Sequence, residues 1–132
     1  MEFKNWYNLA PKLPRQRIMI EGLTDRLYTE DDIKDFMSKL TKLVGMRPLG
    51  QALAYIAGNM GYGGWQHWVT SGVHVYTYPA VTTGSGSVTG KADQCLVSVD
   101  AYTCKPFDNE KAVAFTKEYF NCTEIVWQEV RV

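Results

Sequence analysis

A chain of 132 residues, 45% of them hydrophobic and 13% aromatic, is long enough for one domain and apolar enough to bury a core. Lysine plus arginine and aspartate plus glutamate number 14 each, so no net charge attracts nucleic acid or an anionic membrane. The chain has no apolar run of the roughly 20 residues that span a bilayer, no signal-peptide pattern, and three cysteines without CxxC spacing, which predicts a soluble, cytoplasmic protein with reduced thiols.

The beginning of the chain divides into an arm and the start of a domain. Residues 1–16 alternate poorly and contain Pro11 and Pro14, which predicts an extended N-terminal arm. Residues 17–132 are predicted to form a single domain. Its first element is a buried strand over residues 17–23, where apolar side chains follow one another.

The next element has the strongest helix pattern in the chain. Thr29 is the predicted N-cap, and three acidic residues follow it where the helix dipole favours negative charge. Gly45 is the predicted end. The predicted apolar face has spacings of three and four and consists of Ile33, Phe36, Met37, Leu40 and Leu43.

Several short strands are predicted in the middle of the chain. Residues 49–56 predict a strand, residues 58–64 a glycine-rich turn, and residues 65–69 and 73–78 two further strands. Residues 79–91 are rich in Thr, Gly and Ser, which predicts a mobile loop or hairpin tip.

The last part of the chain completes the predicted fold. Residues 96–102 predict a strand, Asp108 caps a second helix, and residues 125–132 predict the final strand. The apolar positions of this helix are Ala112, Val113, Phe115, Tyr119 and Phe120. Because strands outnumber helices, we expect a two-layer α/β (α+β) sandwich, with a mostly antiparallel sheet and two helices on one face.

Two segments predicted to lie on neighbouring strands carry most of the reactive side chains. They are Thr70-Ser71-Gly72-Val73-His74-Val75-Tyr76-Thr77-Tyr78-Pro79 and Asp100-Ala101-Tyr102-Thr103-Cys104. Together they resemble the prokaryotic S-adenosylmethionine decarboxylase family, which carries Glu-Ser-His, three residues, His-Thr-Tyr/Trp-Pro-Glu, and later an acidic-Tyr/Phe-Thr-Cys-Gly segment. The resemblance covers the order of elements from Arg17 to the end, and it implies the same two-layer fold.

The resemblance implies a reactive centre at Ser71. In the family, the serine at this position attacks the carbonyl before it, the chain is cut between the residues matching Thr70 and Ser71, and the serine becomes a pyruvoyl group. That group does the work of pyridoxal phosphate in other decarboxylases. Cys104 falls on the cysteine that returns a proton after carbon dioxide leaves. The implied activity is decarboxylation of S-adenosylmethionine or a related amino acid in polyamine (spermidine) biosynthesis, by a homodimer.

Five positions depart from the family pattern. Thr70 and Gly72 replace the glutamate and histidine that flank the serine, and Lys105 replaces the glycine after the cysteine. Tyr76 replaces the histidine that assists cleavage, and Ala80 replaces the glutamate that holds the substrate ribose. A second hypothesis therefore stays open: an unprocessed homologue that binds an adenosyl compound or a small amine, or that regulates a partner subunit.

The candidate catalytic residues are Ser71, Cys104, His74 and Tyr76. A phenol with an ordinary pKa of about 10 is a poor base at neutral pH, so Tyr76 is a weak substitute for a histidine. His74 is a candidate to replace it, because residues two apart on a strand share a face.

Three aromatic residues, Tyr62, Trp68 and Tyr78, are candidate substrate contacts. No metal site is predicted, since His67 and His74 have no third ligand at a suitable spacing. A sheet that binds RNA is disfavoured by the neutral charge and by the absence of basic-aromatic motifs.

Overall fold

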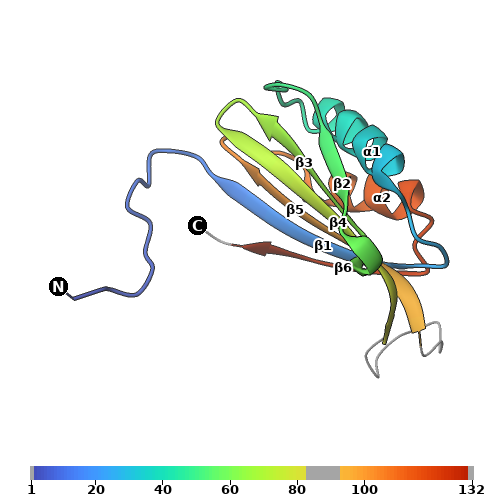
Figure 1. Cartoon of the computed structure of the whole chain (residues 1–132). Coiled ribbons are helices and arrows are strands. Elements are labelled where there is room, and N and C mark those ends of the chain that lie inside the picture. Colours follow the sequence, from blue (N-terminus) through green and yellow to red (C-terminus); the bar gives the residue numbers. More distant parts are fainter. Residues whose placement is uncertain (1, 83–92, 131–132) are drawn as a thin grey trace.

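The computed structural model describes residues 2–82 and 93–130, and within these residues six strands form one antiparallel sheet in the order β2-β3-β4-β5-β1-β6. The strands are β1 (Gln16–Thr24), β2 (Leu53–Ile56), β3 (Tyr62–Trp68), β4 (Ser71–Thr82), β5 (Asp93–Thr103) and β6 (Glu124–Val130). The helices α1 (Glu30–Leu43) and α2 (Asn109–Tyr119) cover one face, and a short 3-10 helix η1 (Gly58–Met60) follows β2 (Figure 1). The predicted two-layer fold is confirmed.

Both helices begin at the predicted caps. The Asp32 carboxylate accepts a hydrogen bond from the Thr29 N–H at 3.0 Å, and the Asp108 carboxylate accepts one from the Lys111 N–H at 3.2 Å. The buried face of α1 contains the predicted residues with one exception. Leu43 is 44% exposed, whereas Val44 packs against the core, so the stripe continues through Val44 after Leu40.

The core lies between the helices and one face of the sheet. Alternate residues of the central strands point to this face and are at most 1% exposed: Ile18, Ile20, Val73, Val75, Val97 and Val99. The residues between them point away from the helices. We call this side the open face; it carries Arg17, Met19, Trp65, His74, Tyr76, Asp100 and Tyr102.

The region predicted as a glycine-rich turn differs from the prediction. β3 begins at Tyr62, so Gly63 and Gly64 belong to the strand. The reason is the close approach of α1, because a Cβ at Gly64 would lie 2.3 Å from Cγ2 of Ile33. The strand predicted over 49–56 is shorter and comprises only β2, Leu53–Ile56.

The strands around the predicted 79–91 loop are longer than expected. β4 continues to Thr82 and β5 starts at Asp93, with a break in the register between Tyr78 and Val81. The rest of the predicted loop, residues 83–91, lies outside the described residues, as do the last two residues of the predicted final strand. Among the described residues, no helix has both the length and the hydropathy to cross a membrane.

Candidate functional site

The hairpin between β3 and β4 contains the peptide bond that the resemblance marks for cleavage. Trp68 pairs with Ser71, so Val69 and Thr70 alone make the turn. Thr70 has a φ of 58°, a left-handed conformation that is unfavourable for a β-branched residue. The turn is held from outside by a hydrogen bond from the Val69 N–H to the Arg47 carbonyl at 3.0 Å. The Thr70–Ser71 bond therefore directly follows a strained residue.

Ser71 and Cys104 come together at the ends of β4 and β5. Ser71 is 6% exposed, and its Oγ accepts a hydrogen bond from the Cys104 N–H at 2.9 Å. The Cys104 Sγ lies 3.8 Å from the Val69 carbonyl oxygen. The hydroxyls of Ser71 and Thr70 lower the pKa of the Cys104 thiol, since both stabilise the thiolate. Three of the predicted site residues thus form one cluster.

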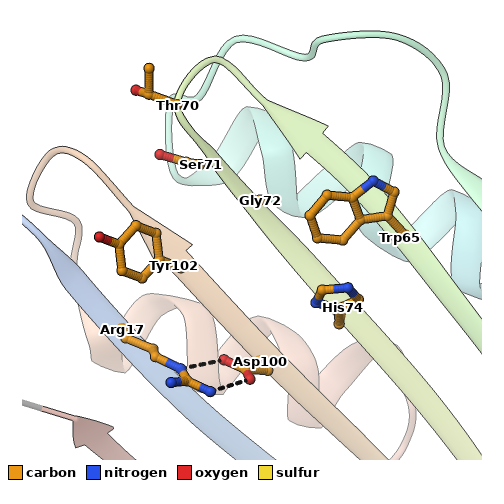
Figure 2. A pocket seen from close by; sticks show the side chains of 8 residues that line it. All are labelled: Arg17, Trp65, Thr70, Ser71, Gly72, His74, Asp100 and Tyr102. Atoms are coloured by element: carbon orange, nitrogen blue, oxygen red, sulfur yellow. Dashed lines mark hydrogen bonds and ion pairs between the residues drawn. The ribbon is translucent and has the colours of Figure 1, made fainter. Parts of the chain in front are cut away.

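A pocket of about 390 Å³ opens beside this cluster. It is lined by Arg17, Trp65, Thr70, Ser71, Gly72, His74, Asp100 and Tyr102 (Figure 2). Trp65 from β3 and Tyr102 from β5 stand on either side of Gly72. A Cβ at Gly72 would lie 2.9 Å from Cη2 of Trp65, so the tryptophan ring occupies the space that a larger side chain would need.

Polar groups also line this pocket. His74 pairs with Trp65 on one side, with ring centroids 4.1 Å apart, and with Asp100 on the other. Burial lowers the pKa of His74, and the nearby Asp100 carboxylate only partly opposes this effect. Arg17 reaches across from β1 and makes two hydrogen bonds to Asp100, at 2.9 and 2.7 Å (Figure 2). His74 is therefore neutral at neutral pH beside a fixed ion pair.

Ser71 and His74 do not face each other. They are three residues apart on β4, so their side chains project to opposite sides of the strand. Tyr76 lies on the open face with His74, and their ring centroids are 6.1 Å apart. Tyr76 does not line the pocket beside Ser71 but borders a second, smaller cavity of about 240 Å³ that shares Trp65 and His74 with it.

The three predicted substrate contacts are not brought to the pocket. Trp68 is fully buried on the helix side, where its Nε1–H donates to the Thr41 Oγ1 at 2.8 Å. Tyr62 packs against the same core. Tyr78 lies beyond Tyr76 on the open face, with ring centroids 6.4 Å apart. Trp68 and Tyr62 are therefore core residues rather than substrate contacts.

The sequence pattern gave no role to Tyr102 or to the ion pair of Arg17 with Asp100. Trp65, Tyr102, Arg17 and Asp100 all lie within predicted strands, so a signal was present. Using it would have required the pairing of β1 with β5 and of β3 with β4. Among the described residues, no three His, Cys, Asp or Glu side chains are grouped so that they could hold a metal ion.

Comparisons with known proteins agree with the fold. The family model described as S-adenosylmethionine decarboxylase matches residues 19–131. The crystal structure of the adenosylmethionine decarboxylase from Aquifex aeolicus VF5 is similar to this chain, with a TM-score of 0.63, 15% sequence identity and 89% of each chain covered, which shows a shared fold. A search of curated proteins gave no match. From the extent of the family match, this chain belongs to the S-adenosylmethionine decarboxylase family, as a divergent member.

Proposed function

We propose that this protein cuts its own chain between Thr70 and Ser71 and is then a pyruvoyl-dependent decarboxylase of S-adenosylmethionine or a related amino acid. Family membership supports the reaction class. One observation carries the proposal: the strained Thr70 directly precedes Ser71, whose hydroxyl is held by Cys104. A strained residue at a reacting bond raises the energy of the starting state and favours its conversion.

The proposed cleavage converts Ser71 into a pyruvoyl group in four steps. The Ser71 Oγ attacks the Thr70 carbonyl carbon, the amide C–N bond breaks, and an ester joins the two residues. Elimination then releases the Thr70 carboxylate. Addition of water and loss of ammonia leave a pyruvoyl group at residue 71. The Cys104 N–H orients the attacking oxygen, and the Cys104 side chain, whose pKa the Ser71 and Thr70 hydroxyls lower, would accept the proton of the Ser71 hydroxyl.

The surroundings of residue 71 fit this group. Residue 71 lines a pocket of about 390 Å³ and is next to the Cys104 thiol, which can supply a proton. When formed, the pyruvoyl ketone binds the substrate amine and accepts the electron pair released as carbon dioxide leaves. Trp65 and Tyr102 would flank the substrate, the neutral imidazole of His74 would exchange protons on the open face, and Cys104 would protonate the product carbon.

A second candidate function is binding without processing. In the described part of the chain, the Ser71 hydroxyl contacts Cys104 but no histidine, and His74 points to the other side of β4. This arrangement favours an intact chain that uses the pocket to hold an adenosyl compound or a small amine, or that regulates a partner subunit. In either case we propose a homodimer, on the basis of the family resemblance.

The test is the intact mass of the freshly purified protein under denaturing conditions, with Ser71→Ala as the control. Processing predicts two fragments that meet between Thr70 and Ser71. Their summed mass should equal that of the uncut chain plus one water minus one ammonia, and the Ser71→Ala chain should stay whole. Release of carbon dioxide from S-adenosylmethionine then tests the substrate. A single full-length mass for the wild type would exclude pyruvoyl catalysis and leave the binding function.

A further inference from the structure

The N-terminal arm exposes an unusual amount of apolar surface. Within residues 2–15, which form no helix or strand, the large exposed side chains are Phe3 (91%), Trp6 (66%), Tyr7 (54%), Leu9 (79%) and Leu13 (52%). Grouped exposed apolar residues of this size usually mark a contact with another molecule. The family match begins at residue 19, so residues 2–15 lie outside it.

Residues 3–9 of the arm have the pattern of a strand without a partner. In an extended chain Phe3, Tyr7 and Leu9 share one side, while Trp6 points to the other. A turn closed by the Leu13 N–H and the Ala10 carbonyl, at 2.9 Å, separates this segment from β1. Figure 1 shows the arm leaving the body of the protein rather than lying along its sheet.

The edge strand β2 has complementary features. Among the described residues it pairs with β3 alone, so the backbone groups along its other side are available for a further strand. The large apolar side chains on and around this edge are also exposed: Leu49 (54%), Leu53 (44%), Tyr55 (66%), Ile56 (61%) and Met60 (64%). An exposed edge with apolar side chains is suited to the addition of an extended segment.

We propose that the arm of one copy adds to the β2 edge of a second copy, and that the two copies exchange arms reciprocally. Phe3, Tyr7 and Leu9 of the arm pack beside Leu53 and Tyr55 of the partner subunit. This interface goes beyond the proposed decarboxylase function, because it assigns a role to residues outside the family match.

The area that the arm can bury favours exchange between copies. About 19 Å separates β1 from β2 of the same chain at 4.8 Å per strand, and an extended arm of about 15 residues spans up to about 50 Å, so the arm is long enough to reach the β2 edge of either copy. Burying Phe3, Tyr7 and Leu9 from each arm, at roughly 150–200 Å² each and with a matching area on each edge, gives a total on the order of 2,000 Å². A stable dimer interface needs about 1,200–2,000 Å².

Sedimentation of the full chain at several concentrations measures the dimer affinity. The arm variant Phe3→Ser with Tyr7→Ser and the edge variant Tyr55→Lys should each weaken dimerisation by roughly a hundredfold or more. The matched control is Val126→Ser, because Val126 is 60% exposed on the opposite edge strand β6 and should change nothing. A monomeric wild type, or unchanged affinity in the arm and edge variants, would overturn the proposal.

A second measurement identifies which chain the arm contacts. Tyr7→Cys with Tyr55→Cys should form a disulfide on oxidation, and peptide mapping of a mixture of ¹⁴N- and ¹⁵N-labelled protein should find light and heavy peptides joined. Joined peptides from one isotope only would show that the arm folds onto its own sheet, which contradicts exchange. Neither result depends on whether Ser71 is processed, so failure here is distinct from failure of the decarboxylase proposal.

Discussion

Replacing Thr70 by glycine tests whether the β3–β4 turn stores strain. A residue with a Cβ in the left-handed region costs about 1–2 kcal/mol, and glycine removes that cost while adding about 0.5–1 kcal/mol of unfolded-state entropy. With a φ of 58° at Thr70, the net expectation is that Thr70→Gly raises the free energy of unfolding by about 0.5–1 kcal/mol. The same change should slow cleavage, because the strained starting state is relaxed.

The stability measurement uses urea unfolding in a Ser71→Ala background, so that the chain stays uncut. Two controls separate strain from other effects. Thr70→Ala keeps a Cβ in the turn and should not raise the free energy of unfolding. Asn121→Gly should raise it less than Thr70→Gly does, since asparagine tolerates the left-handed φ of 49° found at residue 121. Cleavage is followed by intact mass in chains that retain Ser71. A Thr70→Gly chain that is no more stable than its parent would refute the stored strain.

Three further predictions concern single side chains. Cys104, whose pKa is lowered, should react with iodoacetamide before Cys122, whose pKa burial raises to about 11; peptide mapping at pH 7 gives the order. Trp68→Phe should lower the free energy of unfolding by about 2–3 kcal/mol, since the change removes the hydrogen bond to Thr41 and leaves a cavity. Urea unfolding measures this loss. Burial lowers the pKa of His74 below 6.5, so the folded state binds fewer protons than the unfolded state. The free energy of unfolding should therefore fall as the pH drops below 6.5, and it should fall less in the His74→Gln variant. Thermal unfolding between pH 7.5 and pH 5 measures this difference.

The parts of the fold predicted from sequence are those set by local chemistry. The cap at Thr29 and the apolar spacing of α1 act within a few residues, so its beginning and buried face could be read directly. The beginning of β3 could not, because Gly63 and Gly64 remove the alternation that marks a strand. The need for Gly64 comes from α1, about 30 residues earlier in the chain, through its close contact with Ile33.

The same division holds for the candidate site. Ser71 and Cys104 were identified from two short segments, and the structure brings them together. The ion pair of Arg17 with Asp100 depends on the pairing of β1 with β5, which joins residues 83 positions apart. The sequence proposed Trp68 as a substrate contact, whereas the structure buries it on the helix side. The face on which a strand residue lies depends on register, and no local pattern fixed the register of β3.

The order of the strands determines what a broken Thr70–Ser71 bond would leave behind. The N-terminal piece would supply β1, β2, β3 and α1, and the C-terminal piece would supply β4, β5, β6 and α2. Since β1 lies between β5 and β6, the two pieces would be interleaved within one sheet rather than placed side by side. They would stay associated in native buffer, and their separation on unfolding would make the melting temperature depend on protein concentration.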